Sequence, residues 1–222
     1  AISEHVRKRI EKLYHRSAEV IYPPVDTNFF SPTGQAPGDY FLIVSAFAPY
    51  KRLELAVEAF NKLGYSLKII GEGQDSEFLK KIAAPHIEFL GWRSNEEIRS
   101  YYAGCRAFIF PGEEDFGITP LEAQAMGRPV IAYARGGALE TVIPEVSTWK
   151  SEYDIPKEKT VRPTGVFFQE QTSDALIEAV RLFESIETRF IPEVARQNAL
   201  AFGVEVFVKR IQNLIKDLVA RC

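Results

Sequence analysis

The sequence has few of the residues from which disulfide frameworks and metal centres are built. Its 222 residues include two cysteines, Cys105 and Cys222, and three histidines. Two thiols cannot complete a four-cysteine zinc site, and the histidines are not spaced as a ligand pair on one helix face. We therefore expect no metal centre. Both cysteines lie in apolar or helical contexts, which is typical of proteins in a reducing, cytoplasmic compartment.

The chain also lacks an excess of positive charge and long apolar runs. Lysine and arginine number 27 against 30 acidic residues, so the formal net charge is −3. The basic footprint of a nucleic-acid-binding protein is absent, and so is the run of about 18 apolar residues that crosses a bilayer. We expect no nucleic-acid partner. Because the chain begins with Ala1 and its single methionine is Met126, we expect it to be a piece of a longer protein.

What the sequence does contain is an alternation of strand-like and helix-like segments. Apolar runs of strand length occupy residues 40–45, 66–70, 87–90, 107–110 and 129–133. Helical spacing or capping signals lie between them, at residues 53–63, 77–83, 94–97 and 120–126. This alternation predicts an α/β fold with a doubly wound, Rossmann-like parallel sheet. Ligands bind such sheets beyond the carboxyl ends of the strands, which directs attention to the loops 45–52, 71–75, 91–94, 111–119 and 134–138.

Two flanks differ from this predicted sheet domain, which we place at residues 38–202. Residues 1–37 contain a charged amphipathic helix over 2–16 and a proline-rich stretch. Residues 203–222 contain a long amphipathic helix. Inside the sheet domain, the polar, proline-bounded segment 144–163 has no clear period and is interpreted as a surface insertion.

The densest group of candidate site residues follows the strand that ends at Phe110. The residues Phe116, Gly117, Ile118 and Thr119 lead into a predicted helix, whose first amides would suit a phosphate group. Glu114 and Glu122 lie on either side of this turn, where carboxylates could bind sugar hydroxyls.

Both glutamates also have a structural interpretation, which the sequence leaves open. Thr119, Pro120 and Glu122 fit the N-cap, N1 and N3 positions, so Glu122 could complete a capping box. Residues 113–115 could simply form a solvated acidic loop.

Lys51 is a second candidate, because Pro49-Tyr50-Lys51-Arg52 lies between a strand end and a helix start. Next to a phosphate, Lys51 would supply a mobile point charge and Arg52 a planar fork of donors. The structural alternative is an ordinary solvated lysine.

These residues belong to a longer series of motifs. In chain order the series comprises Val20 to Asp26, Pro49-Tyr50-Lys51-Arg52, Gly71-Glu72-Gly73, Phe89-Leu90-Gly91, Glu114-x-Phe116-Gly117, Glu122-Ala123, Gly127-x-Pro129-Val130, Gly136-Gly137 and Thr164-Gly165. With this series the chain resembles the C-terminal half of retaining glycosyltransferases of family 4, which have the two-domain GT-B architecture. Around Lys51 it is most similar to mannosyltransferases that build O-antigen-type glycans.

The resemblance implies a role for each candidate. This half would bind a nucleotide-sugar donor as substrate, with no essential metal or other cofactor. Lys51 would neutralise the diphosphate, and the amides of residues 116–119 would hold its distal phosphate. Glu122 would bind the ribose, Glu114 the transferred sugar, and the loop with Trp92 would flank the base. Glu114 and Lys51 would then be the residues closest to the chemistry.

One position departs from the family pattern. Many members have an arginine five residues before the lysine, where this sequence has Ala46. The usual pair of diphosphate-binding cations is therefore incomplete, and Arg52 or Arg135 would have to compensate.

The function implied by the resemblance is transfer of a hexose, mannose from GDP-mannose, to a glycan or lipid-linked acceptor in polysaccharide biosynthesis. The acceptor would bind the missing N-terminal domain, so this piece would bind nucleotide without transferring sugar. We expect a cytoplasmic protein that contacts the inner face of a membrane only through the missing half. Two alternatives remain: a non-catalytic nucleotide-sugar-binding module, with Ala46 as the first sign of decay, and a GT-B nucleotide-sugar epimerase.

Overall fold

The computed structural model describes residues 1–145 and 162–220 of the chain. Within these ranges, six parallel strands form one sheet in the order β3-β2-β1-β4-β5-β6. The strands are β1 (Tyr40–Val44), β2 (Ser66–Ile70), β3 (Ile87–Gly91), β4 (Phe108–Phe110), β5 (Val130–Tyr133) and β6 (Gly165–Phe168). The predicted Rossmann-like class is confirmed, because this is the order of a doubly wound nucleotide-binding sheet. Most of the predicted insertion 144–163 lies outside the described residues.

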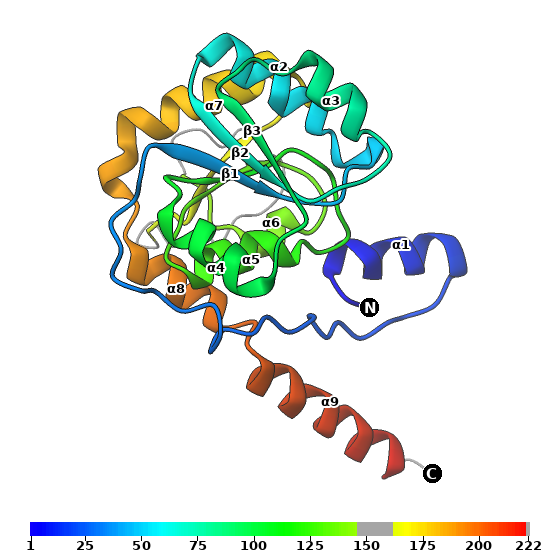
Figure 1. Ribbon diagram of the computed structural model, residues 1–222. Helices are drawn as coiled ribbons and strands as arrows, with labels where there is room; N and C mark the ends of the chain where they lie inside the picture. The colour runs from blue at the N-terminus through cyan, green and yellow to red at the C-terminus, as the bar shows by residue number, and fades with distance from the viewer. Residues whose placement is uncertain (146–161, 221–222) are drawn as a thin grey trace.

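Helices cover both faces of the sheet, as Figure 1 shows. One face carries α2 (Leu53–Leu63), α3 (Ser76–Ile82) and α7 (Ser173–Ile186). The opposite face carries α4 (Asn95–Gly104), α5 (Ile118–Ala125), α6 (Ala138–Thr141) and α8 (Pro192–Leu200). The central strand supplies both cores by alternation, since Phe41 and Ile43 belong to the first core and Leu42 to the second.

The sequence predicted five of the six strands and missed β6. The missed strand consists of Gly165, Val166, Phe167 and Phe168, all buried beside β5. A run of four residues with no alternation is a weak signal when it stands alone. Its hydrogen-bonded pairing with β5, which is visible only in the structure, identifies it as a strand.

Two helix boundaries follow the predicted local chemistry. Gly64 ends α2 in the left-handed region, with φ of 73°. Ser94 begins α4 with a complete capping box, in which the Glu97 amide donates to Ser94 Oγ and the Ser94 amide donates to Glu97 Oε2.

The predicted capping box of α5 is wrong. The helix begins at Ile118, with Gly117 and not Thr119 at the N-cap and no side chain bonded to the first amides. Gly117 adopts φ of 89°, which turns the chain into the helix earlier than the sequence indicated. Pro120 fits inside the first turn because the amides there have no intrahelical acceptor. Pro120 occupies N3, so Glu122 stands two residues past the position that a capping box requires.

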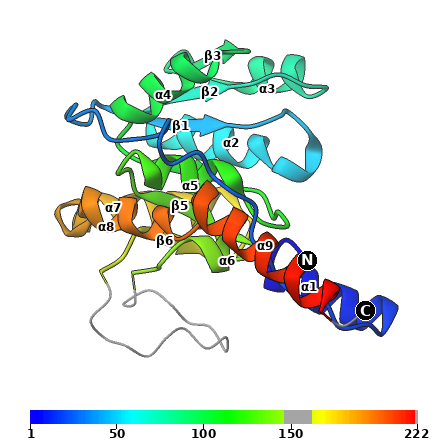
Figure 2. The ribbon, with the colours of Figure 1, turned by 90° about the horizontal axis from the view of Figure 1, so that it is seen from below.

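The two flanks leave the sheet domain in different ways. Helix α1 (Glu4–Tyr14) packs beside the sheet, and the following segment makes a single bridge, Val25 to Gly203. Helix α9 (Val204–Val219) buries none of its residues and extends away from the sheet domain in both views (Figures 1 and 2). None of the helices in the described ranges combines the length and hydropathy that a transmembrane span needs. Short 3-10 turns lie at Pro49–Lys51 and Glu187–Arg189.

Candidate functional site

The candidate site lies where the strand order changes direction, between the central strands β1 and β4. The loops after these strands enclose a cavity of about 340 Å³. Its walls are Ile2, Pro23, Val44 to Ala46, Lys51 and the run Glu114 to Thr119. Crevices at this position are where parallel sheets bind their ligands, so the topology and the cavity point to the same place.

Lys51 and Glu114 meet inside this cavity. Lys51 Nζ lies 2.6 Å from Glu114 Oε1, and the two side chains are only 15% and 23% exposed. The lysine comes from the short 3-10 turn after β1 and the glutamate from the loop after β4. The solvated interpretation of both residues is therefore wrong. A ligand that binds Lys51 must share the ammonium with Glu114 or displace it.

The first turn of α5 forms one wall of the cavity. Gly117, Ile118 and Thr119 all line it, and no side chain caps their amides. The amides at a helix start carry partial positive charge and lack intrahelical acceptors. Together with Lys51, they form a seat for an anion.

Glu122 has a different partner from the one that its sequence position suggested. The Tyr102 hydroxyl donates to Glu122 Oε2 at 2.9 Å, within contact also of the Thr119 carbonyl at 3.3 Å. Burial raises the pKa of the Glu122 carboxyl, and the bond from Tyr102 opposes this rise. Its other carboxylate oxygen lies outside this bond, but Glu122 is not among the residues that line the cavity.

A glycine pair holds the acidic loop in place. The Gly137 amide donates to the Glu114 carbonyl at 2.8 Å. A Cβ on Gly137 would overlap the backbone of Phe116, and one on Gly136 would overlap the Glu114 carbonyl. Only glycine allows this approach, so the turn after β5 fixes the loop that carries Glu114.

A second cavity, of about 280 Å³, lies beyond the neighbouring strands β2 and β3. Its lining includes Phe47, Phe89 and the glycine turn Gly71-Glu72-Gly73. The Trp92 amide donates to Glu72 Oε1 at 3.2 Å, which ties the loop after β3 to that turn. The Trp92 side chain itself is 71% exposed and lines neither cavity. Gly91, and not Trp92, is the residue at this end of β3 that lines the second cavity.

Neither arginine considered as a replacement at Ala46 reaches the cavity. Arg52 Nε pairs with Glu54 Oε1 at 2.6 Å, and Arg135 is exposed beyond β5. Among the residues that line the cavity, Lys51 is the one cation. Within the described ranges no group of three or more histidine, cysteine or acidic side chains is arranged to hold a metal ion.

The sequence did not predict that the N-terminal flank lines the cavity. Ile2 and Pro23 line the cavity, although residues 1–37 appeared to lie outside the sheet domain. Ile2 belongs to no motif, and the Val20 to Asp26 motif that contains Pro23 does not indicate which loops it contacts. Only the three-dimensional path of the chain brings both residues to the loops after β1 and β4.

The strand order and an anion seat at the change of direction define a nucleotide-binding class of α/β domain. Comparison with known families makes this more specific, because the model described as glycosyl transferases group 1 matches residues 25–202. The chain belongs to this family.

Individual relatives agree with the family. An uncharacterised glycosyltransferase of Methanocaldococcus jannaschii is 28% identical over 162 residues, which are 71% of this chain and 46% of that protein. The GDP-mannose-dependent alpha-(1-6)-phosphatidylinositol monomannoside mannosyltransferase of Mycobacterium tuberculosis is 30% identical over 172 residues, 64% of this chain and 45% of the relative. The chain thus spans slightly under half the length of these relatives.

Solved structures support the fold. Anabaena HepE in complex with UDP matches with a TM-score of 0.79 at 20% identity, over 98% of this chain and 63% of HepE. The structural neighbours are GT-B glycosyltransferases, so the predicted architecture of this half is confirmed.

The glycine pair generates a stability prediction. Replacing Gly137 by alanine forces its Cβ into the Phe116 backbone, so we expect a loss of about 2 kcal/mol or more in the free energy of unfolding. Gly34→Ala is the control, because Gly34 has φ of 77° but open space around it; backbone strain alone costs it about 1 kcal/mol. Urea unfolding measures both variants. Equal losses would show that close approach does not hold the loop.

The raised pKa of Glu122 predicts that replacing this residue by glutamine increases the free energy of unfolding by an amount that depends on pH. A carboxyl whose pKa is higher in the folded than in the unfolded state stabilises the fold below the unfolded value and loses that contribution as it ionises. Glu122→Gln, which has no charge to bury, should therefore be more stable than the wild type at pH 7. The difference should shrink as the pH falls from the raised folded pKa toward about 4.3, the unfolded value, and vanish below it. A difference that is constant from pH 4 to pH 7 would contradict this account.

Proposed function

We propose that the chain is the donor-binding half of a retaining glycosyltransferase of family 4, which transfers mannose from GDP-mannose to a glycan or lipid-linked acceptor. The observation that carries the proposal is the anion seat, formed by Lys51 and the uncapped first turn of α5, which line the same cavity. The mannosyltransferase name of the mycobacterial relative supports mannose as the sugar. The O-antigen-type motif around Lys51 supports the same choice.

The seat fits a diphosphate in both charge and shape. The α5 amides offer fixed donors to one phosphate group, and Lys51 offers a mobile ammonium from the facing loop. When the bond between sugar and diphosphate breaks, negative charge develops on the leaving phosphate. Donors that are already in place at that point stabilise the transition state.

The nucleoside end of the donor would extend from the seat toward the sheet edge. Glu122 would accept from the ribose hydroxyls while its other oxygen keeps the Tyr102 bond. The second cavity, between Phe47, Phe89 and the Gly71–Gly73 turn, is the place for the base.

Glu114 would act on the transferred sugar. Its carboxylate pairs with the ammonium of Lys51, and an arriving diphosphate would replace the Glu114 carboxylate by phosphate oxygens at Lys51. The freed carboxylate then faces the sugar and orients its hydroxyls. In the reaction, the bond from sugar C1 to the diphosphate breaks, the acceptor oxygen bonds to C1 on the same face, and the acceptor proton passes to a phosphate oxygen.

The acceptor would bind in the half that this chain does not include. Holding donor and acceptor together supplies much of the rate of a transfer reaction. The chain alone should therefore bind the nucleotide without transferring sugar, and it spans slightly under half of its relatives' length.

Calorimetric titration tests the proposal. GDP should bind more tightly than UDP, and Lys51→Ala should weaken GDP about 10- to 100-fold. A charge-assisted hydrogen bond contributes about 1.5–3 kcal/mol, and about 1.4 kcal/mol corresponds to tenfold in affinity. Guanosine, which has no phosphate, should bind the variant and the wild type equally.

The control is Lys62→Ala, since Lys62 pairs with Asp174 and lines neither cavity. This variant should bind GDP like the wild type. Equal loss of GDP and guanosine in Lys51→Ala would show that Lys51 has a structural role. If UDP bound more tightly than GDP, GDP-mannose would be the wrong donor and a uridine diphosphate sugar would replace it.

Glu114→Gln should distinguish the two proposed roles of Glu114, which are pairing with Lys51 and orienting the transferred sugar. In the complete two-domain enzyme we expect turnover to fall more than tenfold, a loss of over about 1.4 kcal/mol of transition-state stabilisation. In this chain GDP affinity should rise a few-fold, because Lys51 no longer has to leave an ion pair worth up to about 1 kcal/mol. Normal turnover, or a large drop in GDP affinity, would remove Glu114 from this role.

A further inference from the structure

The acidic loop next to the anion seat has cationic neighbours from two parts of the chain. Three consecutive carboxylates each lie opposite a basic side chain. Glu114 pairs with Lys51, whereas the neighbours of Glu113 and Asp115 both come from α1: His5 Nε2 lies 3.9 Å from Glu113 Oε1, and Arg9 Nη2 lies 2.8 Å from Asp115 Oδ2. Helix α1 is thus set against the loop that carries the candidate catalytic glutamate.

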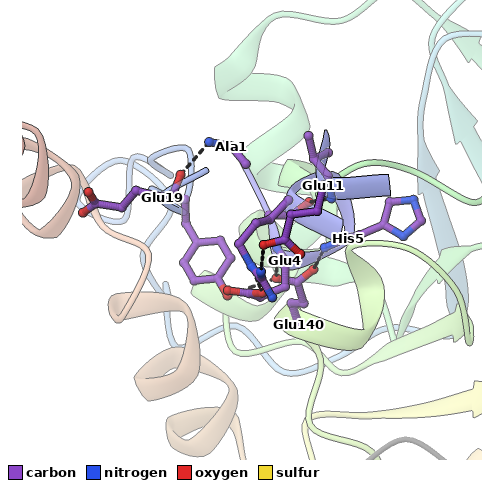
Figure 3. Close-up of polar contacts among 10 residues, drawn as sticks. Ala1, Glu4, His5, Glu11, Glu19 and Glu140 are labelled. Atoms are coloured by element: carbon purple, nitrogen blue, oxygen red, sulfur yellow. Dashed lines mark hydrogen bonds and ion pairs between the residues drawn. The ribbon is translucent and has the colours of Figure 1, made fainter. Parts of the chain in front are cut away.

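Helix α1 is held firmly at this position. Figure 3 shows the Glu140 carboxylate at the start of the helix, where it accepts from the amides of Glu4 and His5 at 2.8 and 2.9 Å. The Tyr22 hydroxyl donates to the same carboxylate at 3.0 Å. Ser3, the N-cap residue, is fully buried and accepts from the Val6 amide.

The element that holds α1 also holds the acidic loop. Glu140 lies on α6, which directly follows the turn of Gly136 and Gly137. The same turn hydrogen-bonds to Glu114 through the Gly137 amide. Helix α1 and the acidic loop are therefore positioned relative to each other by one short segment, and Ile2 completes the wall of the cavity.

The net charge of the cavity lining explains why the position of α1 affects ligand binding. Two carboxylates, Glu114 and Asp115, line the cavity, against the one ammonium of Lys51. An incoming diphosphate would meet an excess of negative charge once it takes Lys51 from Glu114. Arg9 is bound to Asp115 at 2.8 Å and compensates its charge. Both side chains are about half exposed, so the pair adds little to folding stability.

We propose that α1 completes the donor site, with Arg9 as a positioning residue that neutralises Asp115 so that the anionic end of a nucleoside diphosphate can enter. The inference rests on the proposed function. Arg9 and His5 both lie outside the family match of residues 25–202. Arg9 thereby takes part of the role for which the sequence at Ala46 supplies no cation.

Calorimetric titration of this chain with GDP at low salt tests the inference. Arg9→Gln should weaken GDP about three- to tenfold, the effect of one partly screened unit charge on a multiply charged ligand. Guanosine affinity should not change. The matched control is Lys12→Gln, on the same helix with the same change of charge but without the pairing to Asp115 that Arg9 has. Its GDP affinity should stay within about twofold of the wild type.

Two further measurements distinguish charge compensation from a structural effect. Adding Asp115→Asn to Arg9→Gln should restore GDP affinity to nearly the wild-type value, because it removes the carboxylate that Arg9 neutralises. Raising the salt to about 0.5 M should reduce the loss in Arg9→Gln, since screening weakens exposed charges.

The outcomes separate this inference from the function on which it rests. If the wild type binds neither GDP nor UDP, the proposed function fails and the inference fails with it. If the wild type binds GDP and Arg9→Gln matches Lys12→Gln, the inference alone is overturned. A loss that Asp115→Asn does not rescue would also overturn it, because Arg9 would then act by a route other than Asp115.

Discussion

The site depends on one close contact, the packing of the Gly136-Gly137 turn against the backbone of the acidic loop. The Gly137 amide bonds to the Glu114 carbonyl, and neither glycine has room for a Cβ. This contact sets the position of Glu114 and of the α5 start that follows it. Through Glu140 on the next helix, it also sets the position of α1. A turn after β5 thus aligns the N-terminal helix α1 with the acidic loop.

Charge balance links the site to its proposed ligand. The charged residues of the cavity are paired, Lys51 with Glu114 and Asp115 with Arg9. A diphosphate would replace the carboxylate at Lys51 and release Glu114 toward the sugar. Binding of the diphosphate and release of the sugar-orienting carboxylate are then coupled, as the proposed mechanism requires.

The sequence predicted what local patterns determine and missed what distant contacts determine. Buried runs such as Phe41 to Val44 identified five strands, and Ser94 with Glu97 identified a helix start. The predicted start of α5 was wrong, because Gly117 in a left-handed conformation, and not Thr119, occupies the N-cap position of that helix. The pairing of Arg9 with Asp115 joins residues 106 positions apart, and no spacing in the sequence indicates it.

The central claim is that the cavity between β1 and β4 seats a diphosphate. A crystal structure of this chain with GDP tests it most directly. The account predicts phosphate oxygens within hydrogen-bond distance of Lys51 Nζ and of the first amides of α5, with the Lys51–Glu114 pair opened. Phosphates bound elsewhere, or bound with that 2.6 Å pair still intact, would contradict it.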